Sequence, residues 1–289
     1  MGAQPALSIR QATTRDVAAC GPICYEAFRA INEHHNFPPD IPTPERALQV
    51  IEWMFSNPKF YCVVAEVAGT IIGSNCLDER GVIAGVGPIT IDPIQQNRGV
   101  GGALMLAVIE RAQQKSFAGV RLVQAAFHSR SMSLYTKLGF LIREPLAVMQ
   151  GKTARRHFDG ITVRNATTSD VAQGNALCER VHGHHRAQEL ADGIHMGAAK
   201  VAERAGRIVA YTTGLAFFGH SVAETNEDLA ALIASVDQFG GPGILLPTRN
   251  TELFRWCLEN GLKMVEPMTL MTMGLYNEPR GAYLTSISF

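Results

Sequence analysis

An internal repeat limits the folds open to this chain of 289 residues more than any other feature. Residues 8–17 and residues 162–171 carry similar residue types at matched positions. Each copy reads as a short strand, a Thr, Ser or Asp helix cap and a helix. A single recurrence on this scale indicates a duplicated domain. We predict a first domain over residues 1–150, a polar linker over 151–157 and a second domain over 158–289.

The composition excludes several classes of partner. The chain is 46% hydrophobic and has 26 basic and 26 acidic residues, so there is no electrostatic case for nucleic acid or an anionic membrane. No apolar run reaches the roughly 20 residues that span a bilayer, and the N-terminus lacks the pattern of a signal peptide. We therefore expect a soluble, cytoplasmic protein. None of the six cysteines forms a CxxC pair, and we expect buried, reduced thiols.

A strand, a glycine-rich turn and a helix follow one another between residues 86 and 112. The first N–H groups of a helix lack internal partners, and the helix dipole adds positive charge there. Glycines at 99, 101 and 102 remove the Cβ atoms that would keep a phosphate away from these amides. Arg98 can supply a full charge. The stretch therefore predicts an anion site.

Three phosphate-loop patterns can be compared with this turn. A Walker loop ends in Gly-Lys-Ser/Thr, whereas this turn ends in Gly-Gly-Ala, and the dinucleotide pattern GxGxxG would need a glycine at Leu104. The pattern that fits is Gln/Arg-x-x-Gly-x-Gly, formed here by Gln96, Gly99 and Gly101. It resembles the acyl-CoA pyrophosphate loop of the GNAT acyltransferase superfamily. The order of elements in the first half is similar to that of the GNAT fold, so we expect an α/β protein of two tandem GNAT-like domains with mixed sheets.

A second motif, Leu-Tyr-x-Lys-Leu-Gly-Phe, covers residues 134–140. It resembles the last GNAT motif, in which a helix packs near the thioester sulfur and a tyrosine, here Tyr135, points at it. A phenol with a pKa of about 10 is protonated at neutral pH and can donate to a departing thiolate. Taken alone, Tyr135 fits ordinary core packing better, but its spacing to the loop favours the catalytic role. Where the family usually has an asparagine, this chain has the ionisable His128.

The resemblance implies acetyl-CoA, or another short acyl-CoA, as co-substrate, without a metal. Its pyrophosphate would lie on the loop amides and its pantetheine beside the preceding strand. The implied cofactor-binding residues are Ile89, Ile91, Gln96, Asn97, Arg98, Gly99, Val100 and Gly101. The implied chemistry is direct attack of a neutral amine on the thioester, so the cysteines are not expected to be nucleophiles.

The attacking amine must lose a proton, directly or through water. The GNAT fold usually places a carboxylate near its fourth strand, but residues 82–91 contain no acid. The candidates are Glu79, which could equally be an ordinary turn residue, and His128 across the cleft. His34 and Phe37 lie in a proline-rich loop between the first two helices, where the family builds its acceptor pocket.

The second half lacks the glycine-rich loop. At the equivalent place Thr225 and Asp228 predict a capping box, and Glu224 and Glu227 add negative charge where phosphates would lie. Cys257 takes the position of the tyrosine. This half resembles the degenerate module of tandem GNAT proteins, with a structural role and one wall of the acceptor pocket. Its histidines lack interleaved carboxylates or cysteines, so they predict no metal site: His182, His184, His185 and His195.

Together these features predict an acetyl-CoA-dependent N-acetyltransferase acting on a small primary amine. A non-catalytic acyl-CoA or metabolite sensor stays open because the strand carboxylate is missing. A peptide N-terminal acetyltransferase also stays open, although it would need an open acceptor groove. The sequence does not identify the amine, and it leaves a homodimer open.

Overall fold

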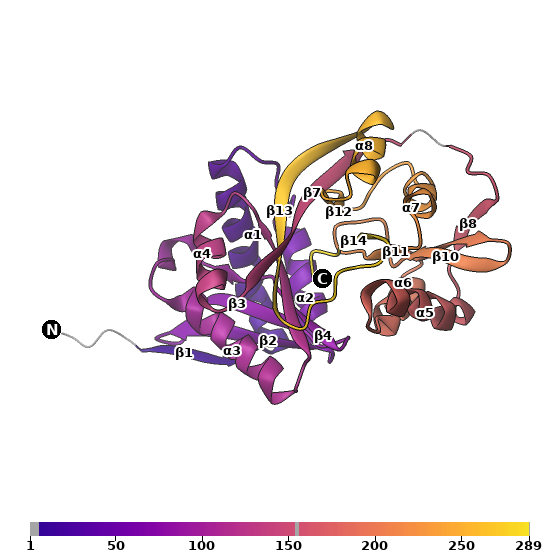
Figure 1. Ribbon diagram of the computed structural model, residues 1–289. Coiled ribbons are helices and arrows are strands. Elements are labelled where there is room, and N and C mark those ends of the chain that lie inside the picture. Colours follow the sequence, from indigo (N-terminus) through magenta and orange to yellow (C-terminus); the bar gives the residue numbers. More distant parts are fainter. Residues whose placement is uncertain (1–5, 154–155, 289) are drawn as a thin grey trace.

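The computed structural model describes residues 6–153 and 156–288 (Figure 1). The elements of the first half are β1 (Leu7–Gln11), α1 (Val17–His34), α2 (Pro44–Ser56), β2 (Phe60–Val67), β3 (Thr70–Asp78), β4 (Ile83–Val86), β5 (Thr90–Ile91), α3 (Val100–Gln114), β6 (Gly119–Ala125), α4 (Ser129–Lys137) and β7 (Leu141–Gly151). Those of the second half are β8 (Ile161–Asn165), α5 (Val171–His182), α6 (Ala187–His195), β9 (Lys200–Arg204), β10 (Arg207–Thr212), β11 (Ser221–Ala223), α7 (Asn226–Ile233), β12 (Ile244–Pro247), α8 (Thr251–Glu259), β13 (Leu262–Gly274) and β14 (Ala282–Leu284).

The predicted duplication is visible in the side chains that begin each half. Arg10 donates to Asp16 at 2.8 Å and to Glu66 at 2.6 Å. In the second half Arg164 repeats this network with Asp170 and Glu203 at 2.8 and 2.6 Å. Each aspartate also closes a capping box with a threonine before the first helix. The two halves therefore start with the same local structure.

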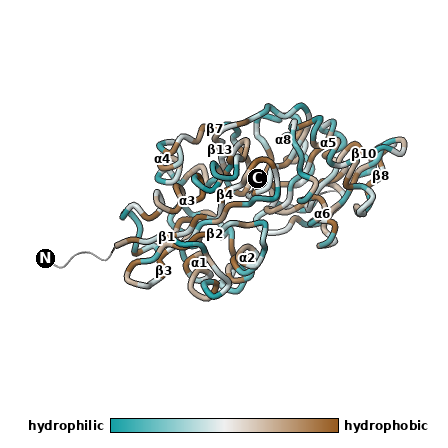
Figure 2. Tube along the Cα trace, turned by 90° about the horizontal axis from the view of Figure 1, so that it is seen from below, coloured by the Kyte–Doolittle hydropathy of each residue, from teal (hydrophilic) through white to brown (hydrophobic). Residues whose placement is uncertain are grey.

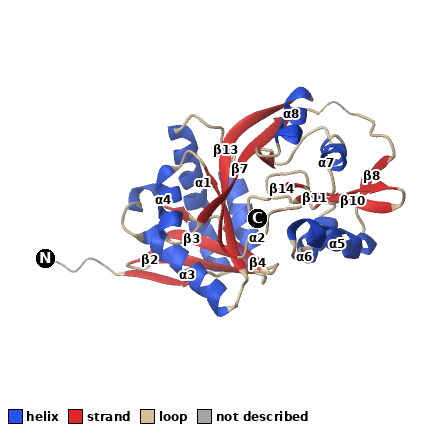
Figure 3. Ribbon diagram, viewed as in Figure 1, coloured by secondary structure: helices blue, strands red, loops and turns tan. Residues whose placement is uncertain are grey.

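Helices cover both faces of the first-half strands (Figure 3). Alternate side chains of β2 point to opposite faces of the sheet. Val63 and Ala65 pack in one core with α3, whereas Cys62 and Val64 pack under α2 and α1 on the other side. Because both faces are buried, the strand is almost continuously apolar. All six cysteines are buried as free thiols, which confirms the expectation for them.

The sheet of the first half opens beyond β4. The predicted strand over 86–91 is interrupted at Gly87 and Pro88, since proline has no N–H to donate to a neighbouring strand. Before the break, β4 pairs in parallel with β6, and after it β5 pairs with β3. The segment of β4 and β5 therefore separates from β6 after Val86. The gap between them lies next to the glycine-rich turn.

The two halves share strands. The larger sheet of the described residues has nine strands, in the order β1-β2-β3-β4-β6-β13-β7-β12 with β5 beside β3. Thus β13 of the second half lies between β6 and β7 of the first, and β7 lies between β13 and β12. Figure 1 shows β7 and β13 as long neighbouring strands at the junction of the halves. The predicted domain boundary therefore does not divide the sheet.

The closing region of the first domain forms one continuous strand, β7, because β13 and β12 pair with it on its two sides. This strand continues into Gly151, the first residue of the predicted linker. Residues 154 and 155 of that linker lie outside the described residues.

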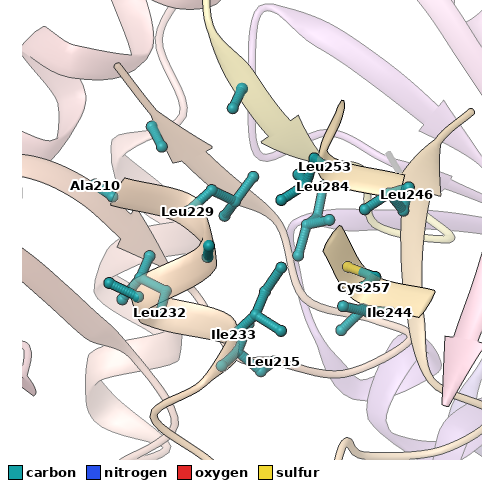
Figure 4. Close-up of a cluster of buried hydrophobic side chains, with 14 of the residues drawn as sticks. Ala210, Leu215, Leu229, Leu232, Ile233, Ile244, Leu246, Leu253, Cys257 and Leu284 are labelled. Carbon is teal, nitrogen blue, oxygen red and sulfur yellow. The ribbon is translucent and has the colours of Figure 1, made fainter. Parts of the chain in front are cut away.

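The second half has its own sheet and core. Its described strands follow the order β14-β11-β10-β9-β8. Figure 4 shows Leu229 and Ile233 of α7 on the side of the helix that faces α8 and β12, and Leu232 on its other side. All three belong to one buried cluster. Along the tube in Figure 2 hydrophobic and hydrophilic stretches alternate, and no helix of the described residues combines the length and apolar character needed to cross a membrane.

Candidate functional site

The glycine-rich turn forms an open helix N-terminus. Asn97 and Gly99 both have left-handed backbones, with φ of 66° and 80°, and Gly99 is the N-cap of α3. Ala103 N donates to Gly99 O at 3.1 Å. The N–H groups of the first turn before Ala103 therefore have no acceptor within the helix. They are available to an anion, and the helix dipole favours one there.

Gly101 must be small for this turn to approach its neighbours. A Cβ there would lie 3.2 Å from Cδ1 of Ile91 and 3.3 Å from Cδ2 of Leu134. The turn is thus held between β5 and α4, and a larger side chain would have to displace one of them. It would also stand beside the free amides.

A cavity of about 550 Å³ lies in front of this turn. Its walls come from α1, from β5 and the segment before it, from the turn and from α4. Six of the predicted cofactor-binding residues line it: Ile89, Ile91, Gln96, Asn97, Gly99 and Gly101. The cavity therefore joins the open helix N-terminus to the gap in the sheet.

Two predicted cofactor-binding residues do not line this cavity. Arg98 points to the surface, where it donates to Gln95 Oε1 at 3.0 Å. Val100 is 3% exposed and packs in the core under α3. The free backbone N–H of Val100 is compatible with the prediction, but its side chain serves the core.

Arg130 of α4 supplies the cation that Arg98 does not. It lines the cavity and donates to Asn97 Oδ1 at 3.2 Å and to Gln96 Oε1 at 3.0 Å. The sequence analysis missed this residue, because only the tertiary structure brings the start of α4 beside the turn. The sequence indicated it only by its place in the first turn of α4, the helix that contains Tyr135.

A smaller cavity of about 170 Å³ adjoins the first. Ile89, His128 and Tyr135 line both cavities. The second half contributes Phe217, Phe218, Met268, Ile287 and Ser288 to the smaller one. The two cavities therefore meet at the side chains that the sequence singles out for catalysis.

Tyr135 and His128 have the properties of a proton donor and a proton acceptor. Burial raises the pKa of Tyr135 above its usual range, so the phenol stays protonated at neutral pH. Burial, Arg130 and His35 lower the pKa of His128 to about 4, so its imidazole is neutral. No residue of the described chain forms a hydrogen bond with His128 Nε2. One nitrogen of His128 is therefore free to bind or accept a proton.

Glu79 does not reach this site. Its carboxylate accepts two hydrogen bonds from Arg111, at 2.7 and 3.1 Å, and it lines neither cavity. Glu79 does lie in the turn before β4, as the sequence predicts, but this turn faces the C-terminal end of α3, where Arg111 lies. The geometry therefore favours His128 of the two predicted bases.

The predicted acceptor residues are divided. His34 lines the larger cavity. Phe37 lines neither cavity and instead stacks on Phe127, with ring centroids 4.2 Å apart and planes at 16°. Phe37 therefore fixes the proline-rich loop against the end of β6. Among the residues that the structure describes, no three His, Cys, Asp or Glu side chains are grouped as ligands of one metal ion.

Comparison with known proteins finds a family likeness in the first half. Residues 26–140 match the model of the acetyltransferase (GNAT) family. This part of the chain is therefore similar to GNAT acetyltransferases. None of the curated protein sequences compared with the chain matches it.

Solved structures extend the likeness to both halves. A proposed acetyltransferase from Pyrococcus horikoshii superposes with a TM-score of 0.70 at 18% identity, over 96% of this chain and 94% of that one. A GCN5-related N-acetyltransferase from Sphaerobacter thermophilus gives 0.61 at 14% identity, over 98% of both chains. A tandem GNAT protein of the clavulanic acid biosynthesis pathway gives 0.53 at 13%, over 93% of this chain and 98% of that one. These similarities establish a tandem GNAT fold.

Proposed function

We propose that this protein is an acetyl-CoA-dependent N-acetyltransferase with one working site, in the first half, and a small primary amine as acceptor. The observation that carries the proposal is the meeting of the two cavities at Tyr135 and His128. The larger cavity leads to the open N-terminus of α3, and the smaller cavity extends from the meeting point in another direction and is lined mainly by apolar side chains. Two substrates entering from the two sides would meet beside a phenol and a neutral imidazole.

The residues would divide the work as follows. The first-turn amides of α3 and the Arg130 guanidinium would bind the pyrophosphate. Ile89 and Ile91, at the strand edge, would flank the pantetheine. His128 Nε2 would take a proton from the amine as its nitrogen attacks the thioester carbonyl, and Tyr135 would give its proton to the sulfur as the C–S bond breaks. A proton returned from His128 through solvent would restore the phenol.

The cavity walls favour this function over the two alternatives. A pure sensor needs no proton acceptor, yet His128 offers a free nitrogen where the cavities meet. A peptide acceptor needs an open groove, whereas Phe217, Phe218 and Ile287 of the second half wall the smaller cavity. The first observation supports catalysis, and the second supports a small amine.

The described residues of the second half offer no comparable anion site. The N-cap Thr225 forms its capping box with Asp228, and Arg204 pairs with Glu227 and Asp228, both at 2.9 Å. In addition, β14 pairs with β11 and is followed by a bridge from Thr285 to Leu245 of β12. The C-terminal segment thus fills the gap that is open between the equivalent strands of the first half. We infer a structural role for this domain.

Calorimetry with acetyl-CoA and a thiol-release assay with a panel of primary amines test the proposal. Gly101→Val should weaken acetyl-CoA binding at least tenfold, because its side chain would stand at the free amides. Ala103→Val is the matched control, since Ala103 lies on the same turn but does not line the cavity. Equal affinity in the wild type and Gly101→Val would refute the cofactor site, and binding without thiol release for any amine would favour the sensor.

A further inference from the structure

Two carboxyl groups from different halves of the chain face each other beside the smaller cavity, a half-buried one on Asp40 and a fully buried one on Glu266. Asp40 follows α1 in the proline-rich loop and lines this cavity. Glu266 lies on β13, and its carboxyl group is within hydrogen-bonding range of that of Asp40. Met268, which points to the same face of β13 two residues later, also lines the cavity. Asp40 therefore forms part of the cavity wall, and Glu266 lies behind it against the Asp40 carboxyl group.

A β-bulge turns Glu266 towards this wall. Met264 pairs with Met149 and Glu266 with the adjacent Val148, so Val265 is an extra residue in the strand. Since adjacent residues of β7 point to opposite faces, Met264 and Glu266 do so as well. Met264 is 43% exposed, whereas Glu266 is 1% exposed. Without the bulge, the glutamate would share the outward face of Met264.

The pair lacks a cationic partner within the described residues. No donor reaches either oxygen of Glu266 or Oδ1 of Asp40, apart from a proton that the two carboxyl groups share. Burial and the neighbouring carboxyl group raise the pKa of Glu266 to about 9, and burial raises the pKa of Asp40, while its hydrogen bonds with Glu266 and Asn32 oppose that shift. Buried acids without counter-charge destabilise a fold, so such a pair usually has a function.

We propose that Asp40 and Glu266 bind the second ammonium group of a diamine acceptor, whose other amine is acetylated beside Tyr135 and His128. This rests on the proposed function, because it places the acceptor in the smaller cavity. Apolar side chains form most of the remaining wall of that cavity. The carboxyl groups would therefore select a ligand with a cationic group, and the length of the cavity would select the spacing between its two nitrogens. Neither half contains this site alone, since Asp40 comes from one and Glu266 from the other.

Binding of the cation should displace the shared proton. The two carboxyl groups interact with each other, and Asp40 also interacts with Asn32. The other titratable side chains that line the same cavity are His128 and Tyr135, and its uncharged polar side chains are Gln124, Ser131 and Ser288. His128 is already neutral and Tyr135 protonated near pH 7, so neither should change its charge on binding. The proton released at neutral pH should therefore come from the carboxyl pair.

The kinetic test uses linear alkane-α,ω-diamines of graded chain length and the n-alkylamines of the same length. In the wild type, the best diamine should exceed its matched monoamine in kcat/KM by about 10- to 100-fold, the usual contribution of a charge-assisted hydrogen bond. Glu266→Gln and Asp40→Asn should remove this preference while leaving acetyl-CoA affinity unchanged. Equal use of both series by the wild type, or a preference kept by both variants, would overturn the proposal.

Thermal unfolding distinguishes a binding pair from a structural one. Glu266→Gln should raise Tm, because the amide is uncharged and relieves the buried pair. Glu144→Gln is the matched control: Glu144 is 2% exposed on the adjacent β7 but has a partner, Arg249, at 2.6 Å. This variant should lower Tm and keep the diamine preference. A lower Tm for Glu266→Gln with unchanged kinetics would assign the pair to stability alone.

A binding measurement separates failure of this proposal from failure of the proposed function. Butane-1,4-diamine and butylamine are titrated by calorimetry into the CoA-saturated protein, in two buffers of different ionisation enthalpy. The diamine should bind with release of about one proton more than butylamine releases, and Glu266→Gln should lose that difference. If no amine is turned over but this signature is present, the catalytic proposal fails and the diamine site stands. If turnover occurs without it, the diamine site is wrong.

Discussion

At the scale of single residues, Tyr135 can be tested by removing one oxygen atom. Tyr135→Phe keeps the ring against Phe140, whose centroid lies 6.3 Å away, but removes the proton donor. We expect kcat to fall by about 100-fold, in the range for general acid catalysis, with the Kd for acetyl-CoA unchanged. Thiol release and calorimetry measure the two quantities. An unchanged kcat at saturating amine would assign Tyr135 to packing.

His128 should make the protein less stable in mild acid. Its pKa is about 4 in the folded state, below the unfolded value of about 6.5. The unfolded chain therefore binds more protons between these values, and stability is lost as the pH falls from about 6.5 to about 4. Between pH 7 and pH 5 the free energy of unfolding should fall by about 2 kcal/mol less in His128→Gln than in the wild type.

Urea unfolding at the two pH values measures this difference. His184, with a pKa of about 4, and the buried His182 and His220 contribute to the acid sensitivity of both proteins. Only the difference between variant and wild type therefore reports on His128. The prediction fails if the two proteins lose the same free energy of unfolding.

At the scale of elements, the first turns of α3 and α7 show how one position of the fold can serve two purposes. In α3, glycines leave the amides free for a ligand. In α7, the side chain of Thr225 accepts from the N–H of Asp228 at 3.2 Å, so the amides are used internally. The same strand-turn-helix unit thus leaves its amides free in one half and caps them with its own side chains in the other.

Removing the cap of α7 should affect stability alone. Thr225→Ala should lower the free energy of unfolding by about 1 kcal/mol, the usual effect of losing an N-cap. The Kd for acetyl-CoA should stay the same, because we place its site at α3. A weaker affinity in a variant that is still fully folded would show that the second half binds the cofactor too.

At the scale of the whole molecule, the exchanged strands join both halves into one unit. Residues 262–274 complete the first-half sheet, and Arg80 adds an ion pair to Asp192 at 3.1 Å. A fragment of residues 1–153 would expose the edges of β6 and β7, which are a risk for aggregation. We expect this fragment not to fold alone, and co-expression with residues 156–289 should restore a soluble complex that binds acetyl-CoA.

The full chain should then unfold in a single calorimetric transition, whose van't Hoff enthalpy equals the measured enthalpy. Because β7 and β13 are each paired into both halves, neither half can lose its sheet without the other. Two well-separated transitions, or a soluble fragment 1–153 that binds acetyl-CoA, would contradict this account.

The sequence alone determined the local elements of this protein. The repeat, the cap at Thr43, the hairpin of β2 and β3 and the glycine-rich turn follow from short-range patterns, and the structure contains each of them. The resemblance to GNAT proteins, and with it the expected α/β fold, rested on two motifs in the right order. These features depend on residues that are close in sequence, because such residues determine the local backbone conformation directly.

The tertiary structure alone decided which residues share the site. Glu79 is turned to Arg111, Phe37 to Phe127, and Arg130 arrives beside Gln96 from a distant helix. The encounter of Asp40 with Glu266 depends on strand exchange and on a single bulged residue. Register and strand order are set by packing of the whole molecule, because the pairing of distant strands depends on burial that no short segment determines.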